Sequence, residues 1–243
     1  MWELILVLAI LFIGSFIQGA SGFGFGLFSM GLLPTLLSLK NSTLLVLALT
    51  VILSLNIAIK FAKYIQVKEL IYIVSSALAG RVLSFFFLNF FGDMDIMKKL
   101  LGFVLIGMVI YLYLNGKQTY TPAFEKPIFP ILIGFIGGVI GGVFAVGGPF
   151  FVFYFLLRYA EKTSYNANLQ ASFVIMNCFT IVLHGINGDF NNNLFLYLLL
   201  GTVAVLFGVN LGLKYFERLP RELIKKLASF IVLIAGLNLI IFS

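Results

Sequence analysis

Charged residues are scarce in this chain of 243 residues. Asp, Glu, Lys and Arg together make up 10% of it, whereas hydrophobic residues make up 61%. Soluble domains typically carry about 25% charged residues, which cover the surface that faces water. This chain cannot do the same, so lipid is expected to cover most of its surface. The composition therefore predicts an integral membrane protein that has the lipid bilayer as its surroundings.

Reactive side chains are also few, with one Cys and one His. A single cysteine, Cys178, excludes an intrachain disulfide framework and a multi-cysteine metal site. A membrane-embedded enzyme would need a nucleophile–base pair or a metal cluster, and no acidic residue lies near the middle of an apolar segment to complete one. We therefore expect no enzymatic activity, no metal and no cofactor. The net charge of +7 would suggest nucleic acid in a soluble protein, but here we attribute it to basic cytoplasmic loops and predict no nucleic acid partner.

Apolar segments follow one another along the whole chain. Segments of about 20 residues are long enough to cross the hydrocarbon layer as helices, so the fold class predicted is an all-α polytopic membrane protein. Two pairs of segments are shorter and meet at glycine-rich joints. Each pair is either two short spans or a hairpin that enters and leaves on one side, and the lengths do not decide between these. The segments are 2–20, 23–39, 42–62, 69–91, 96–114, 128–145, 148–160, 164–187, 193–213 and 223–242.

The two halves of the chain resemble each other. Gly19 and Gly24 recur as Gly142 and Gly147, and a Lys-Lys pair at 98–99 recurs at 225–226. A mid-helix asparagine is also shared, Asn56 in the first half and Asn177 in the second. Internal repeats of this kind mark many secondary transporters. We expect one integrated membrane domain made of a first repeat over 1–115, a linker over 116–127 and a second repeat over 128–243.

The basic residues predict the topology. If the loop 60–68, with its three lysines, lies inside, then twelve of the 16 Lys and Arg lie on the inner side, as the positive-inside rule requires. Both termini then lie outside. The equivalent loops 60–68 and 187–193 lie on opposite faces, which predicts inverted repeats.

Arg81 is the one basic residue near the middle of an apolar segment. A buried arginine costs about 2.5–3.5 kcal/mol on insertion scales, so it normally has a partner. All nine acidic residues lie at segment ends or in loops, and none is available at that depth. Either a substrate anion neutralises Arg81, or its guanidinium bonds to carbonyl groups or reaches the interface.

The glycine-rich joints are the second candidate for the site. Glycine lets the backbone unwind, and a new helix that starts after the joint presents unpaired N–H groups and a partial positive charge, which suit an anion. Glycines also allow close helix packing, but breaks at matching places in two halves point to a transporter's central site. The candidate substrate-binding residues are Arg81, Gln18, Ser21, Gly22, Gly24, Asn56, Gly147, Gly148, Pro149 and Asn177. His184 is a candidate proton carrier, although a lone histidine near a helix end is more often structural.

The joints also carry a resemblance to a known family. Gly22-Phe-Gly24-Phe-Gly26 followed by Pro34, and Gly147-Gly148-Pro149, in a two-half chain rich in Phe and Gly, resemble the TauE/SafE (sulfite exporter-like) permeases. The resemblance implies export or uptake of small sulfur-containing or organic anions, such as sulfite or sulfoacetate, with a coupling ion or proton. It implies the cytoplasmic membrane of a prokaryotic cell as the location.

We therefore predict a secondary transporter that moves a small anion through a central site between inverted repeats. The alternatives are an anion channel, which would need a continuous polar path, and a permease for another small organic anion. A purely structural membrane protein would leave Arg81 and the matched breaks unexplained. The exact substrate, the direction, the coupling ion and the oligomeric state stay open at this point.

Overall fold

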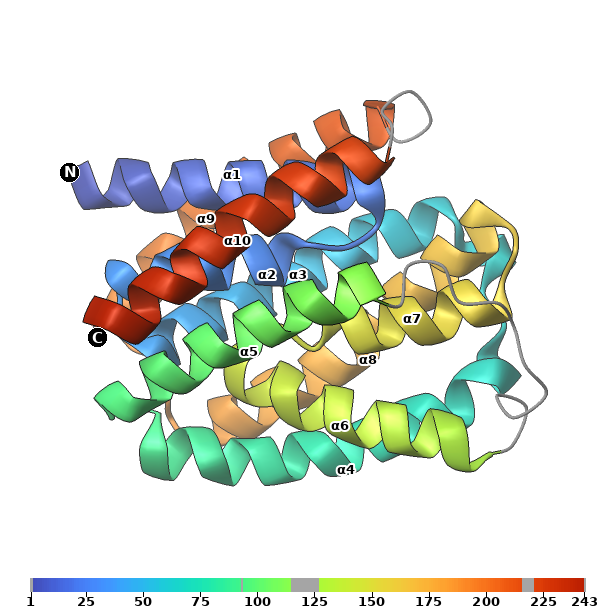
Figure 1. The fold of residues 1–243 in the computed structure, drawn as a ribbon, viewed down its shortest axis with the longest axis horizontal. Helices are drawn as coiled ribbons and strands as arrows, with labels where there is room; N and C mark the ends of the chain where they lie inside the picture. The colour runs from blue at the N-terminus through green and yellow to red at the C-terminus, as the bar shows by residue number, and fades with distance from the viewer. Residues whose placement is uncertain (1, 93, 115–126, 216–220, 243) are drawn as a thin grey trace.

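The computed structural model describes residues 2–92, 94–114, 127–215 and 221–242. These residues form helices joined by short turns, and no strand occurs among them (Figure 1). The helices are α1 (Trp2–Ser21), α2 (Phe25–Leu32), η1 (Leu33–Thr35), α3 (Leu39–Lys60), η2 (Ala62–Tyr64), α4 (Val67–Phe91), α5 (Asp95–Leu114), α6 (Ile128–Phe144), α7 (Gly148–Arg158), α8 (Lys162–Ile186), α9 (Asn192–Tyr215) and α10 (Arg221–Phe242).

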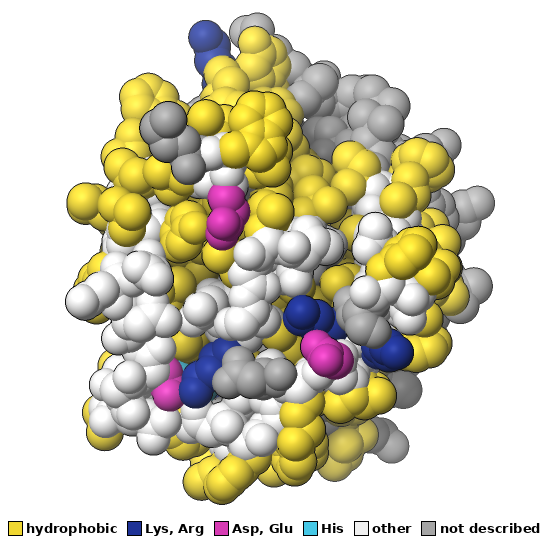
Figure 2. All heavy atoms as spheres, turned by 90° about the vertical axis from the view of Figure 1, so that its left-hand side faces the viewer, with side chains coloured by type: hydrophobic (Ala, Val, Ile, Leu, Met, Phe, Trp, Pro, Cys, Tyr) yellow, Lys and Arg dark blue, Asp and Glu magenta, His cyan; other side chains and the backbone are white. Residues whose placement is uncertain are grey.

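The long helices suit a bilayer in both length and surface. Within the described residues, α1, α3, α4, α8 and α9 are long and apolar enough to cross a membrane. Large apolar side chains such as Phe90, Leu199 and Phe207 are more than two-thirds exposed, at 72%, 71% and 71%. In Figure 2, hydrophobic side chains surround an area of polar side chains and backbone that carries a few charges. The predicted fold class, an all-helical polytopic membrane protein, is confirmed.

Both halves repeat one order of elements, namely a long helix, a break, a short helix and three more helices. The short helices α2 and α7 start at residues 25 and 148, and α3 and α8 start at 39 and 162, so both separations are 123 residues. At this separation the counterpart of Asn177 is Ser54. The predicted match between Asn56 and Asn177 was wrong in register, because it aligned a shared residue type instead of the helix starts.

Helices pack mainly across the two halves. The two largest contacts are α4 against α6 and α1 against α9, followed by α3 against α8 and α5 against α10. Exchanging the two halves leaves this set of pairs unchanged. In Figure 1, α1 and α6 run in opposite directions, and so do α5 and α10. An inverted repeat requires these features, and the relation of the halves by an axis in the membrane plane stays a prediction. The predicted linker 116–127 lies outside the described residues, apart from residue 127.

Glycines bring the cross-half helix pairs into close contact. A Cβ at Gly138 would overlap the backbone of Ala77, and one at Gly142 would overlap the side chain of Ser84 on α4. On the other side, a Cβ at Gly19 of α1 would overlap the backbone of α9 at Val209. The hydrophobic effect does not drive helices together in lipid, so membrane helices associate largely through van der Waals contact. Small residues at such positions increase this contact because they let the helices approach closely.

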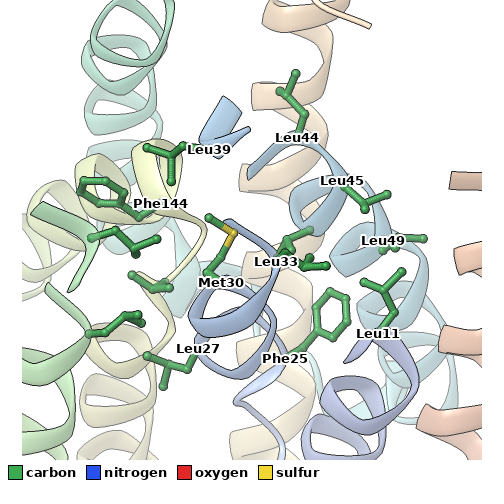
Figure 3. Packing of buried hydrophobic residues seen from close by; sticks show 14 of the residues in the cluster. Leu11, Phe25, Leu27, Met30, Leu33, Leu39, Leu44, Leu45, Leu49 and Phe144 are labelled. Atoms are coloured by element: carbon green, nitrogen blue, oxygen red, sulfur yellow. The ribbon is translucent and has the colours of Figure 1, made fainter. Parts of the chain in front are cut away.

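A core of large apolar side chains fixes the short helix α2. Phe25 and Met30 of α2 and Leu33 of η1 are fully buried, and they pack against Leu11 of α1 and Leu49 of α3 (Figure 3). Further members of the cluster come from α6 and include Phe144. The start of α2, which follows the first glycine joint, is therefore held in place by packing on several sides.

Candidate functional site

Both glycine-rich joints break a helix in the same way. After α1 ends at Ser21, Gly22 and Gly24 have φ angles of 89° and 114°. After α6 ends at Phe144, Ala145 has a φ of 55°. Gly22 and Ala145 are counterparts at the separation of 123 residues, so each long helix ends at a left-handed residue, which is a common helix ending. Glycine adopts this conformation freely, whereas an alanine there is strained by about 1–2 kcal/mol.

The two breaks touch each other inside the protein. A Cβ at Gly26, in the first turn of α2, would overlap the carbonyl oxygen of Ala145. Gly24 and Gly26 from the first break and Gly147 and Gly148 from the second line the same cavity. The structure thus brings together the two segments in which the sequence analysis expected a common site.

The cavity between the breaks has a volume of about 40 Å³. A single water needs about 10–15 Å³ on this measure, so there is room for a small ion or a few waters. Four polar side chains line it, and most of the rest of the wall is apolar. The lining residues are Gln18, Phe23, Gly24, Gly26, Leu27, Leu47, Thr50, Arg81, Ala145, Val146, Gly147, Gly148, Pro149, Phe151, Phe173 and Asn177.

Arg81 supplies the only full positive charge in that lining. Its side chain comes from α4 and the residue is 3% exposed, so it does not reach the interface. One terminal nitrogen donates to the carbonyl oxygen of Gly141 at 2.8 Å, and the other donates to Asn177 Oδ1 at 2.9 Å. Its Nε is buried and has no hydrogen-bond partner among the described residues.

No carboxylate within the described ranges lies in ion-pair distance of Arg81. The sequence suggested two interpretations of Arg81, neutralisation by a substrate anion or hydrogen bonding to carbonyl groups, and each describes part of the site. The guanidinium is hydrogen-bonded to a carbonyl and an amide, but its charge is not neutralised by any of the residues that the structure describes. Two neutral acceptors leave a buried cation that an anion would stabilise.

A second polar group surrounds the first break. Gln170 of α8 donates from Nε2 to the carbonyl oxygen of Gly22 at 2.7 Å. Its Oε1 accepts from Gln18 Nε2 at 3.0 Å and from Ser54 Oγ at 2.8 Å. Gln18 Oε1 in turn accepts from the backbone N–H of Phe25, the first residue of α2, at 3.3 Å. These bonds satisfy backbone groups that the break leaves without helical partners.

Each break is therefore held by a side chain from the opposite half of the chain. Arg81 from the first half binds Gly141 beside the second break, and Gln170 from the second half binds Gly22 in the first break. The two side chains differ in charge, because Arg81 is a cation and Gln170 is neutral. Gly80 of α4 approaches the carbonyl of Phe135 as Gly208 of α9 approaches the carbonyl of Phe12. The counterpart of Arg81 is therefore Val209, so the charge of the site exists in one half only.

The predicted site residues do not all reach the cavity. Six predicted residues besides Arg81 line it: Gln18, Gly24, Gly147, Gly148, Pro149 and Asn177. Gly22 and Ser21 lie at the break but outside the lining. Ser21 Oγ lies 2.8 Å from the carbonyl oxygen of Ile17 and 2.6 Å from that of Phe23, and its hydroxyl can donate to either. Asn56 lies outside the lining as well, and its Oδ1 is buried without a partner among the described residues.

His184 lies two helical turns beyond Asn177 on α8, away from the cavity, and it is paired with Asp189. Sequence reasoning missed Gln170 and Thr50. The signal for Gln170 was present, since Asn166, Asn168 and Gln170 put three amides in the first half of α8. Thr50 gave no signal, because a single threonine in an apolar helix is common.

The helix starts add partial charges to the site. Gly148 and Pro149 begin α7, and Gly24 precedes α2. Both helices therefore begin at the cavity lined by Arg81, and the first N–H of α2, that of Phe25, already donates to Gln18. Helix N-termini carry about half a positive charge each and favour anions. The site contains one guanidinium, two helix N-termini and no acidic lining residue.

Comparison with protein families agrees with this arrangement. Residues 6–239 match the family described as Sulfite exporter TauE/SafE. The match covers nearly all of the chain, including both breaks and Arg81. Comparisons with curated proteins and with solved structures give no significant match. The chain therefore belongs to the TauE/SafE family, which is a family of membrane transporters for sulfur-related anions.

Proposed function

We propose that this protein is a secondary transporter that carries a small oxyanion or sulfonate, such as sulfite, through the cavity between its two breaks. One observation carries the proposal. Arg81 is buried at the cavity with two neutral hydrogen-bond acceptors and, in the described part of the chain, no carboxylate. The anion would supply the missing negative charge.

The lining residues have distinct roles in this proposal. The Arg81 guanidinium binds the anion's oxygens, while Asn177 and the Gly141 carbonyl fix its orientation from behind. N–H groups at the starts of α2 and α7 face the anion from either side. The apolar part of the wall, including Phe151 and Phe173, keeps bulk water out, which strengthens each of these electrostatic contacts.

An alternating site fits this cavity better than a channel does. A channel needs a continuous polar path, and the polar side chains that line the cavity gather at the two breaks. The breaks lack continuous helical hydrogen bonding, so they are the places where a change of shape costs least. We further propose that the protein lies in the cytoplasmic membrane of a prokaryotic cell, with both termini outside.

Transport by purified protein in proteoliposomes tests the proposal. The panel consists of sulfite, sulfate, thiosulfate, sulfoacetate, methanesulfonate and acetate, each compared with protein-free liposomes. We expect saturable uptake of at least one sulfur oxyanion or sulfonate, and counterflow exchange when that anion is preloaded. Uptake of none of the panel would overturn the proposal, and non-saturating conductance without counterflow would favour a channel.

Arg81→Ala should abolish the uptake. Arg158→Ala is the matched control, because Arg158 is a half-exposed arginine at the end of α7 that pairs with Glu69 and lies outside the cavity lining. Equal loss of uptake in both variants would show that the effect does not come from the charge at the cavity.

A further inference from the structure

A second buried polar cluster lies at the end of α8, near the side of the molecule that carries both termini (Figure 1). His184 is fully buried, and its Nδ1 lies 2.6 Å from Asp189 Oδ2, in the turn that follows α8. The other carboxylate oxygen of Asp189 accepts from Lys40 Nζ at 2.8 Å and from Asn187 Nδ2 at 2.9 Å. The cavity site does not use any of these side chains.

The surroundings of His184 leave one ring nitrogen without a partner. Nε2 is buried and has no hydrogen-bond partner among the described residues. The ring packs on Phe85 of α4, with the ring centroids 4.9 Å apart. The charged groups that face it are Lys40 at the start of α3 and Asp189, with Arg81 one turn from Phe85 on α4. Helix α6, which also contacts α8, has no titratable residue.

We propose that the His184–Asp189 pair binds the proton that drives anion movement, an inference that rests on the proposed function. The neutral imidazole fits the present arrangement, with Nδ1–H donating to Asp189 and a bare lone pair at Nε2. A proton that binds at Nε2 creates a buried N–H donor, which then needs an acceptor. Water or an anion can supply that acceptor only if this end of the protein opens.

Lys40 connects protonation to opening. The Lys40–Asp189 ion pair joins α3 of the first half to the α8–α9 turn of the second half. A protonated His184 competes with Lys40 for the same carboxylate, because both cations then share one negative charge. The contact between the two halves weakens at this end, and the end can open.

Helix α8 connects the proton to the anion. Asn177, which binds Arg81 at the cavity, precedes His184 by seven residues, so both lie on one face of α8. A shift of the end of α8 therefore moves the amide that orients the guanidinium. Proton binding at one end and anion binding at the cavity both shift the position of helix α8. Coupling between two sites requires such a shared element.

Two transport assays in proteoliposomes separate this inference from the proposed function. The first is accumulation driven by a pH gradient, and the second is counterflow exchange at equal pH, both with sulfite and with methanesulfonate. His184→Gln should lose the gradient-driven accumulation and keep the exchange. Glu69→Gln, which removes an ion pair at the opposite end of α4, should keep both. If wild type shows neither activity, the proposed function fails.

If His184→Gln accumulates both anions as wild type does, the proton site is wrong. Loss of exchange together with accumulation in a folded variant would also overturn it, because His184 would then act on anion passage itself. If His184→Gln does not insert, Asp189→Asn replaces it, since it removes the same pair.

Proton binding can also be observed without transport. The chain has one histidine, so nuclear magnetic resonance of imidazole-labelled protein reports His184 alone. We expect a neutral ring with the proton on Nδ1 at about pH 8, reversible protonation as the pH falls to about 5, and a protonated fraction that rises in Lys40→Ala. A ring that stays neutral over this range in folded protein would refute the site.

Discussion

Replacing Arg81 is the sharpest test of how the cavity holds its anion. Arg81→Ala removes the one full positive charge in the lining and the two hydrogen bonds to Gly141 and Asn177. Truncating one member of a buried hydrogen-bonded charge pair typically costs about 2–5 kcal/mol of binding free energy. At 1.4 kcal/mol per factor of ten, anion affinity should fall by about 30-fold to a few thousandfold.

The stability of the protein should change much less than its affinity for the anion. Arginine in a membrane span costs about 2.5–3.5 kcal/mol on insertion scales, and Arg81→Ala removes that cost. The variant also loses two charge-assisted hydrogen bonds worth about 1.5–3 kcal/mol each. The opposing changes are of similar size, so the thermal midpoint in detergent should stay within a few degrees of wild type.

Arg81→Lys separates charge from geometry. The two terminal nitrogens of Arg81 reach two different acceptors, Gly141 O and Asn177 Oδ1. A lysine ammonium keeps the charge but lacks the planar fork that binds an oxyanion through two bonds. The anion affinity of Arg81→Lys should therefore lie between those of wild type and Arg81→Ala. Wild-type affinity in a folded Arg81→Ala protein would refute the reasoning, and a variant that fails to fold would assign Arg81 a structural role.

Three further changes test other parts of the structure. Gly26→Ala should impair transport severely, because the added Cβ meets the carbonyl oxygen of Ala145 and separates the two breaks; uptake by the inserted variant measures this. Glu69→Gln should lower the thermal midpoint little, since half-exposed ion pairs such as Glu69–Arg158 contribute only about 0–1 kcal/mol. Burial alone would raise the pKa of Asp189, but its hydrogen bonds from Lys40, His184 and Asn187 outweigh burial and hold this pKa below its ordinary value. These hydrogen bonds stabilise the folded protein fully at pH values above the ordinary aspartate pKa of about 3.9. The stabilisation is lost as the pH falls through the lowered pKa that Asp189 has in the folded protein. Wild type and Asp189→Asn should therefore have the same thermal midpoint only at acidic pH.

The helices and the central charge could be read from the sequence for simple physical reasons. Apolar runs of membrane length give helix positions directly, since the bilayer fixes the length of a span. Arg81 stood out because a charge is costly in an apolar segment. The breaks were visible because glycines cluster at corresponding places of the two halves.

The polar partners of the site were harder to predict, because they depend on which helix faces are in contact. Gln170 binds Gly22 across a sequence separation of 148 residues, and Lys40 binds Asp189 across 149. Nothing local in the sequence specifies such pairs. Asn56 was selected because it is polar and central, yet Thr50 faces the cavity and Asn56 does not. A register error of two residues, as between Asn56 and Ser54, turns a helix by more than half a revolution.

The presence of an arginine in only one half limits what each half can do alone. Two copies of the first half, paired as the halves are paired here, would place two guanidiniums beside one cavity. Two copies of the second half would place Val209 at both positions. The single full charge at this site therefore exists only because the two halves differ. The full charge of Arg81 matches a monoanion, whereas the second charge of a dianion is left to the partial charges of the two helix N-termini or to a further cation, such as a proton.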